Sequence, residues 1–258
     1  MKLLQRITLI LFIISALLFA GSRAYHHFLV DDTPPVLTMD SDTVEMGLGD
    51  TRDALLRGVR ATDNRDGDLT REIIVQGVTK LIGENTAKVT YIVFDKANNM
   101  ATCTRTVRYT DYEKPHFSMN QAAVYPVNGP VMLLDRLHAS DVVDGDISGN
   151  IRIVSQNVNA REPGLYSVTA QVSNSLGDLD TVTLKVVVTD NEEPCALTLQ
   201  DYIVYLDVGD SFEPTAYITA PEPYLVTVTH EVNTKLPGMY HVSYTCGADT
   251  VWQTVVVH

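Results

Sequence analysis

An internal repeat of about 80 residues constrains the fold of this chain more than any other feature. The acidic segment DNRDGDLTREIIVQG at 63–77 recurs as DVVDGDISGNIRIVSQ at 141–156. The segment DDTPPVLTM at 31–39 recurs in related form at 111–119 and at 190–199. Repetition at a fixed period indicates that one structural unit is copied along the chain. The sequence therefore predicts three domains, at residues 31–110, 111–189 and 190–258.

Each unit is predicted to be an antiparallel β-sandwich. Apolar residues occupy alternate positions at 89–93 and 168–172, and this period of two is typical of strands with one buried face. Short turns at 98–99, 176–178 and 247–249 predict a hairpin at the end of each unit. Roughly seven short strands per unit favour an all-β, two-sheet architecture.

An apolar segment opens the sequence. Lys2 and Arg6 precede an uncharged run at 7–22, which is the pattern of an export signal, and cleavage is predicted after Ala24. The run is shorter than the roughly 20 residues that span a bilayer comfortably. A cleaved signal peptide and an uncleaved membrane anchor both remain open for residues 1–30. Either predicts an exported protein, secreted or held at the cell surface, with membrane contact only if the helix is uncleaved.

The charge of the remaining chain excludes one class of partner. Residues 31–258 contain all 32 acidic residues and 16 of the 19 basic ones. Nucleic-acid binding needs a basic face, so no nucleic-acid partner is expected. An acidic body is compatible with divalent cations.

The repeated motifs resemble those of the bacterial immunoglobulin-like (Ig-like) domains first described in a pesticidal crystal protein. That family combines an acidic-proline start, a D-N-x-D-G-D-[LI]-[TS] turn, a P-G-x-Y strand and a D-x-A-G-N turn. The first unit matches at 63–70 and 95–98 but lacks the Pro-Gly pair. The second matches at 141–148 and 163–166, whereas the third keeps Pro237-Gly238 and lacks the acidic turn. The resemblance implies three tandem Ig-like domains in a surface or secreted stalk, adhesin or accessory module.

The repeated acidic turns have two interpretations. Clustered carboxylates attract a hard cation such as Ca²⁺, although their spacing differs from that of an EF-hand loop. Alternatively, aspartates cap their own backbone while glycine adopts a positive φ in a tight turn. The candidate calcium ligands, and with them the one candidate cofactor, are Asp63, Asp66 and Asp68 in the first unit and Asp141, Asp144 and Asp146 in the second.

The third unit is the predicted place for binding. Aromatic residues concentrate there, and Tyr217, Tyr224 and Trp252 are candidates for contact with a protein or a glycan, with core packing as the alternative. The segment 219–224 is predicted to be an exposed loop. Cys195 and Cys246 lie in this unit and could form a disulfide in an oxidising compartment.

No catalytic function is predicted. The sequence contains no GxSxG, HExxH, P-loop or GxGxxG motif. The leading hypothesis is a non-catalytic surface protein whose domains act as a spacer and an adhesion-type interaction module for a protein or glycan. A carbohydrate-binding accessory module and a purely structural stalk or assembly subunit remain as alternatives.

Overall fold

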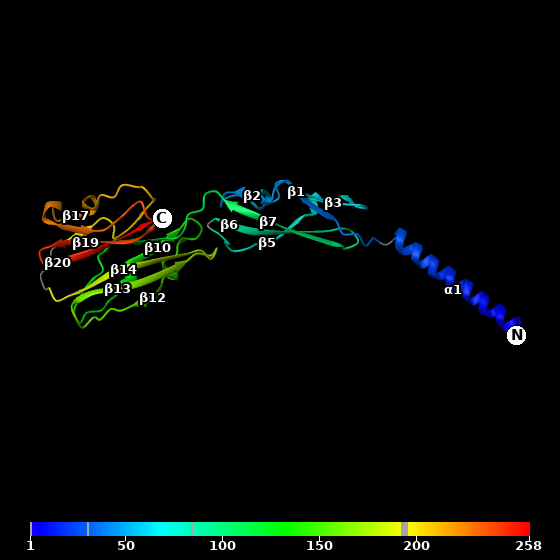
Figure 1. Ribbon diagram of the computed structural model, residues 1–258, viewed down its shortest axis with the longest axis horizontal. Helices are drawn as coiled ribbons and strands as arrows, with labels where there is room; N and C mark the ends of the chain where they lie inside the picture. Colours follow the sequence, from blue (N-terminus) through cyan, green and yellow to red (C-terminus); the bar gives the residue numbers. More distant parts are fainter. Residues whose placement is uncertain (1, 30, 84, 192–195) are drawn as a thin grey trace. The chain divides into compact units, whose positions relative to one another are not determined.

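The computed structural model describes residues 2–29, 31–83, 85–191 and 196–258. The chain divides into two compact units, Met1–Asp111 and Tyr112–His258 (Figure 1). The first contains the N-terminal helix and the first repeat, and the second contains the other two repeats. The predicted domain boundary at residue 190 lies inside the second unit, and the separate folding of these two repeats stays a prediction.

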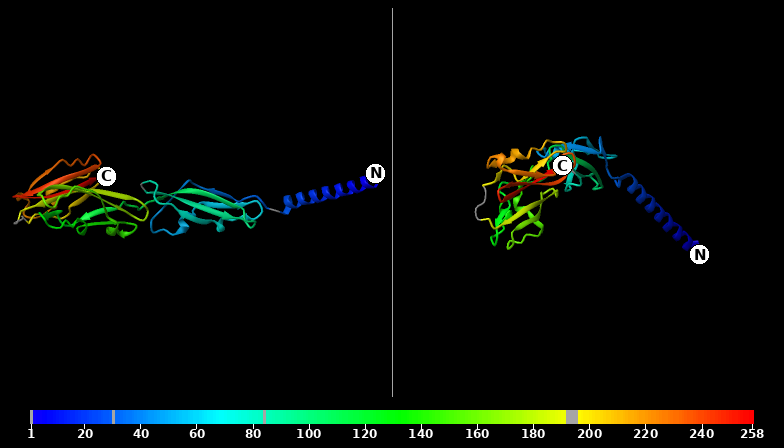
Figure 2. Two further views of the ribbon diagram at one scale, coloured as in Figure 1. Left: turned by 90° about the horizontal axis from the view of Figure 1, so that it is seen from below. Right: turned by 60° about the vertical axis from the view of Figure 1, so that its left-hand side comes forward.

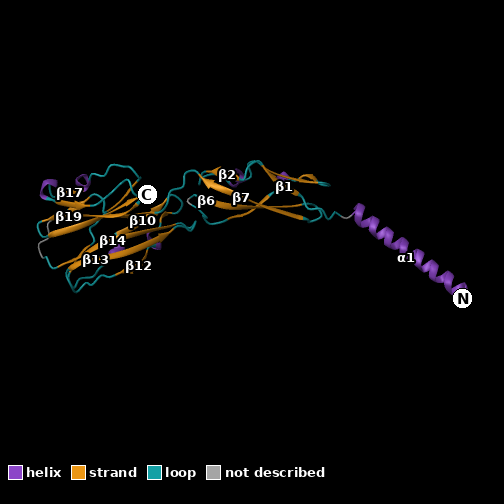
Figure 3. Ribbon diagram, viewed as in Figure 1, coloured by secondary structure: helices purple, strands orange, loops and turns teal. Residues whose placement is uncertain are grey.

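The N-terminal apolar segment forms one long helix, α1 (Lys2–Leu29), as Figure 3 shows. The stretch Gln5–Tyr25 is long and apolar enough to cross a membrane, and none of it is buried in the protein. The helix extends beyond the uncharged run at 7–22 on both sides. Its apolar side chains are exposed because no part of the described protein covers them.

The first repeat is a sandwich of two sheets. A four-stranded sheet has the order β2-β7-β6-β5, and a three-stranded sheet has the order β1-β3-β4. The strands are β1 (Val36–Met39), β2 (Thr43–Met46), β3 (Val59–Asp63), β4 (Gly67–Asp68), β5 (Ile74–Val78), β6 (Thr86–Phe94) and β7 (Met100–Tyr109). Strands β6 and β7 form the predicted hairpin, and β2 runs parallel to β7.

The alternation at 89–93 faces the core as predicted. Val89, Tyr91 and Val93 have no exposed surface, and they pack with Val44, Val59 and Val107 from the other strands. A β-strand points successive side chains to opposite faces, so the pattern places one row of apolar residues in the core.

The second repeat has the same plan. Its sheets have the orders β12-β13-β14-β9 and β11-β10-β8. The strands are β8 (His116–Met119), β9 (Val124–Pro126), β10 (Leu137–Asp141), β11 (Gly145–Asp146), β12 (Arg152–Gln156), β13 (Gly164–Ser173) and β14 (Leu179–Thr189). Strands β13 and β14 form the predicted hairpin, and Val168, Ala170 and Val172 are buried.

The third repeat pairs a four-stranded sheet, β16-β20-β19-β18, with a two-stranded sheet, β15-β17. The strands are β15 (Thr198–Leu199), β16 (Ile203–Leu206), β17 (Ile218–Ala220), β18 (Thr227–His230), β19 (Gly238–Cys246) and β20 (Asp249–Val257). Its buried residues join those of the second repeat in one continuous core. Both views of Figure 2 show the two repeats side by side in the second unit.

Helical structure outside α1 is limited to single turns in the described residues. They are α2 (Arg52–Leu55), η1 (Thr70–Glu72), η2 (Leu133–Asp135), η3 (Ser148–Asn150), η4 (Pro214–Tyr217) and η5 (Pro223–Leu225). The expected loop at 219–224 is partly wrong, because Thr219 and Ala220 belong to β17, a strand that pairs with β15. The all-β architecture after an N-terminal apolar helix is confirmed.

Candidate functional site

The acidic turn of the first repeat is held by its own backbone. Asp63 Oδ1 accepts hydrogen bonds from the backbone N–H groups of Arg65 (2.8 Å) and Asp66 (2.9 Å). Asp68 Oδ1 accepts one from the N–H of Thr70, and Gly67 adopts a φ of 76°. The Asp66 and Arg65 N–H bonds lower the pKa of Asp63, and the side-chain and backbone bonds from Thr70 lower that of Asp68.

The second repeat builds the same turn. Asp141 Oδ1 accepts from the N–H of Asp144, Asp146 Oδ1 accepts from Ser148, and Gly145 adopts a φ of 71°. Bonds from the Ser148 side chain and backbone lower the pKa of Asp146. The predicted capping bonds and the positive glycine φ are therefore present in both turns.

One aspartate of each turn reaches the terminal hairpin of its repeat. Asp66 accepts hydrogen bonds from the backbone N–H (2.8 Å) and Nζ (3.0 Å) of Lys96, which follows β6. Asp144 accepts from the N–H (2.6 Å) and Oγ (2.8 Å) of Ser175, which follows β13. These carboxylates fasten the acidic turn to the hairpin.

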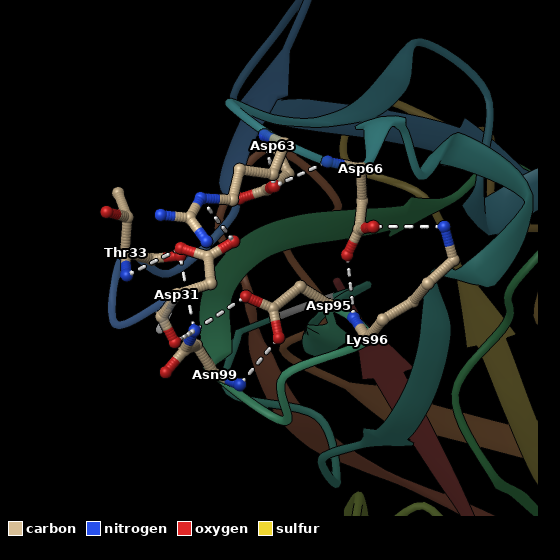
Figure 4. Close-up of polar contacts among 8 residues, drawn as sticks. Asp31, Thr33, Asp63, Asp66, Asp95, Lys96 and Asn99 are labelled. Atoms are coloured by element: carbon tan, nitrogen blue, oxygen red, sulfur yellow. Dashed lines mark hydrogen bonds and ion pairs between the residues drawn. The ribbon is translucent and has the colours of Figure 1, made fainter. Parts of the chain in front are cut away.

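The six predicted calcium ligands do not gather into two sets. In the described part of the chain, three carboxylates come within 4.8 Å of one another at one place, formed by Asp31, Asp63 and Asp95. Figure 4 shows this acidic cluster, in which three separate chain segments meet. Asp31 follows α1, Asp63 ends β3 and Asp95 begins the β6–β7 turn.

The carboxylates of the acidic cluster are each anchored through one oxygen. Asp31 Oδ1 accepts from the N–H of Thr33 (3.2 Å), and Asp95 Oδ1 accepts from the N–H of Asn99 (2.7 Å). Asp63 is anchored by the bonds of its turn. Asp95 is 5% exposed, and the side chain of Asp31 is 9% exposed.

The remaining oxygens have few donors. Asp95 Oδ2 accepts from Asn99 Nδ2 at 2.7 Å, and Asp31 Oδ2 lies 3.8 Å from Arg65 Nε. Asp63 Oδ2 is buried without a hydrogen-bond partner among the described residues. A buried carboxylate oxygen without a donor or cation is energetically costly.

The second repeat solves the same problem with an amide. Asn174 occupies the position of Asp95, as the first residue of the corresponding hairpin turn. Its Nδ2 donates to Asp141 Oδ2 (2.8 Å) and to the hydroxyl of Tyr112 (2.9 Å), and that hydroxyl donates to Asp178 Oδ2. Burial and the neighbouring Asp178 raise the pKa of Tyr112, so its hydroxyl stays protonated.

The sequence prediction included Asp63 but missed Asp31 and Asp95. All three belong to segments that the repeat comparison had already matched. Aligning the hairpin turns, DKANN at 95–99 with NSLGD at 174–178, exposes the exchange of Asp and Asn at their first and last positions. That exchange was the available signal.

The three candidate binding aromatics do not form one surface. Tyr217 is half-buried at the end of η4 and packs against Phe212 with ring centroids 5.8 Å apart. Tyr224, on η5, is 83% exposed. Trp252 is half-buried in β20. Their binding role stays a prediction.

Trp252 lines a hollow of about 650 Å³ in the second unit. Tyr217 and Tyr224 do not line this hollow. The hollow lies between the second and third repeats, with Arg136 and Leu165 from one and Leu197 and Asp249 from the other. Residues 192–195, which precede Ala196 and Leu197 in the sequence, lie outside the described residues.

The predicted disulfide involves one of these residues. Cys195 lies outside the described part of the chain, so its pairing with Cys246 stays a prediction. Cys246 is half-buried at the end of β19, and Cys103 is half-buried in β7.

Two known proteins share sequence similarity with the chain, and no family model matches it. Pesticidal crystal protein Cry22Aa of Bacillus thuringiensis is 30% identical over 162 residues, which cover 60% of this chain and 21% of that protein. An uncharacterized 81.3 kDa protein of Acholeplasma phage L2 is 25% identical over 232 residues, which cover 84% of this chain and 30% of that protein. The chain thus spans less than a third of either relative.

Solved structures give weaker likenesses. The surface layer protein rSbsC(31-844) covers 88% of this chain and 41% of its own length, with 13% identity and a TM-score of 0.22. The match to the protocadherin GammaB4 extracellular domain covers 88% of this chain and 51% of that one, with 12% identity and a TM-score of 0.23. Neither likeness bears on function.

Proposed function

We propose that this chain is a non-catalytic, exported protein of the bacterial Ig-like repeat type. Its β-sandwich repeats act as a spacer and as an adhesion-type interaction module that contacts a protein or glycan. The similarity to part of Cry22Aa supports the repeat type. The assignment of a partner to the third repeat rests on its aromatic residues.

The exposed apolar helix is the observation that supports this function most. Gln5–Tyr25 presents apolar side chains around its whole circumference, and a helix of this kind is stable in a lipid environment rather than in water. The basic residues Lys2 and Arg6 precede the apolar stretch, and by the positive-inside rule this charge distribution favours export of the β-sandwich repeats. Exported repeats that follow an apolar helix suit display at a surface.

Fractionation of cells that express the full chain with a C-terminal tag tests this proposal. The tagged protein is expected in the membrane fraction if the helix is uncleaved, or in the medium if it is cleaved. In intact cells, added protease is expected to digest the membrane-held form. A Leu11→Arg, Leu17→Arg double variant should remain inside the cell, because two charges in the apolar run abolish export. Wild-type protein retained in the cytoplasm would contradict the proposal.

A binding screen tests the interaction role. The full chain in detergent is presented to glycan and surface-protein arrays, with a Tyr224→Ala variant beside it. Loss of a wild-type signal in that variant would assign the contact to the third repeat. If the protein binds to neither array, the adhesion role is contradicted and only the spacer role stands.

A further inference from the structure

The acidic cluster of Asp31, Asp63 and Asp95 has more negative charge than its neighbours compensate. Three carboxylates face one another, and Arg65 is the cation nearest to them in the described residues, 3.8 Å from Asp31. Lys96 is engaged by Asp66 on the other side of the turn. Three carboxylates and one guanidinium leave a net charge of −2, which one divalent cation would neutralise.

The unpartnered oxygen of Asp63 points to a bound ligand independently of this charge. Its other oxygen accepts two backbone N–H groups, so the carboxylate is fixed in position and kept ionised. Oδ2 is buried among the other two carboxylates and has no donor in the described residues. Native structures rarely leave such an atom unsatisfied, and an unrecorded ion is one of the standard explanations.

The second repeat serves as an internal reference. There, Asn174 donates to the equivalent oxygen of Asp141, and the described residues of the second repeat hold no group of three carboxylates like that of the first. The first repeat has Asp95 where the second has this amide, so it lacks the donor and has an additional acceptor. The first repeat therefore needs a cation where the second uses a hydrogen bond.

We propose that Asp31, Asp63 and Asp95 bind one Ca²⁺ ion in the first repeat, and that the second repeat has no such site. One oxygen from each of the three carboxylates lies within 4.8 Å of the other two, and a small inward shift brings all three to the Ca–O distance of about 2.3–2.6 Å. Water completes the coordination. Mg²⁺ fits less well because it sheds its water shell reluctantly.

The ion would fasten the segment after α1 to the first sandwich. Asp31 is the first described residue after the helix, and its backbone carbonyl already accepts a hydrogen bond from Asn99 Nδ2 (3.0 Å). A shared ion adds a second link, from Asp31 to β3 and to the β6–β7 turn. Calcium thus stabilises the start of the first repeat.

Titration calorimetry with CaCl₂ on the full chain, purified in detergent and freed of metal with EDTA, tests the proposal. We expect one ion per chain, with a Kd between about 10⁻⁶ and 10⁻³ M. Asp95→Asn should reduce the affinity at least tenfold while its circular dichroism spectrum stays unchanged, since it copies Asn174. Asp141→Asn changes the counterpart of Asp63 in the second repeat, and this variant should bind Ca²⁺ as the wild type does.

Thermal unfolding gives a second readout. Saturating Ca²⁺ should raise the transition of the first unit by about 5 °C or more in the wild type and leave it unchanged in Asp95→Asn. Trp252 is the one tryptophan of the sequence and reports on the second unit, so its fluorescence transition should not move.

Three results would overturn the proposal. They are an absence of heat and of any thermal shift up to about 5 mM CaCl₂, wild-type binding by Asp95→Asn, and loss of binding in Asp141→Asn. Equal affinity for Mg²⁺ would overturn the choice of ion.

Discussion

At the scale of single residues, the two acidic repeats differ at the first position of the terminal hairpin turn. Asp95 and Asn174 have nearly the same size and occupy the same place in a hairpin turn, yet the amide donates hydrogen bonds and the carboxylate does not. Each of the two residues is 5% exposed, so water cannot supply the missing donor freely. The exchange of one nitrogen for one oxygen therefore separates a turn closed by hydrogen bonds from the turn for which we propose a cation.

Asn174→Asp should destabilise the second unit by about 2 kcal/mol at pH 7, because the change removes two buried donors and places two carboxylates together. Denaturant unfolding followed by Trp252 fluorescence measures this loss. The penalty should shrink toward pH 4–5, since a protonated aspartic acid donates again. Asn159→Asp is the control, because Asn159 is exposed and its Oδ1 acts as an acceptor. Equal effects of the two changes would contradict the prediction.

At the scale of elements, strands of the second and third repeats pack directly on each other. Thr254 of β20 donates through Oγ1 to the carbonyl of Thr183 in β14 (3.1 Å), and Tyr205 of β16 donates to Asp180 Oδ2 (2.6 Å). Within the third repeat, Thr254 Oγ1 lies 3.4 Å from Nδ1 of His241 in β19. The Thr254–Thr183 and Tyr205–Asp180 hydrogen bonds link the sheets of the two repeats within the shared core.

His241 makes this packing sensitive to pH. Burial lowers its pKa to about 4, and Lys185 contributes to the shift. The unfolded chain has a His pKa near 6.5. Between these values the unfolded state binds a proton that the folded state does not, so stability is complete above about pH 6.5 and falls as the pH drops toward 4.

His241→Asn should therefore weaken the pH dependence of the second unit. The Trp252 melting temperature of the wild type should fall more than that of the variant between pH 7.5 and 5. His138→Asn removes an exposed histidine from β10 and serves as the control. Parallel pH profiles for the wild type and His241→Asn would show that His241 does not titrate in this window.

At the scale of the whole molecule, the chain divides into two compact units, and the second of them holds two repeats. The third repeat has a two-stranded sheet opposite its four-stranded one, which gives it less core of its own than the other repeats. Its buried residues continue into the core of the second repeat. We expect these two repeats to unfold together.

A cavity made in the second repeat tests this cooperativity. Leu184 of β14 is 1% exposed, and Leu184→Ala should cost about 3 kcal/mol. If the repeats unfold together, the free energy of unfolding that Trp252 fluorescence reports for the third repeat should fall by this full amount. Val93→Ala in the core of the first unit is the matched control and should leave the Trp252 transition unchanged. A Trp252 transition unaffected by Leu184→Ala would show independent repeats.

Local patterns in the sequence predicted much of this fold. The alternation at 89–93 and 168–172 located buried strand faces, and the turn residues located the hairpins, because side-chain direction and turn conformation depend on near neighbours. The capping bonds of Asp63 and Asp141 were predictable for the same reason, since their partners lie two or three residues away.

Tertiary structure alone decided which carboxylates meet. Asp31, Asp63 and Asp95 belong to three segments that are brought together by sheet pairing and by the turn between β6 and β7, whereas the nearer Asp66 and Asp68 are engaged elsewhere. The sequence by itself determined the repeats, the strands and the apolar helix, because these follow from short-range periodicity. The acidic cluster and the shared core depend on contacts between distant residues, which only the packed sheets specify.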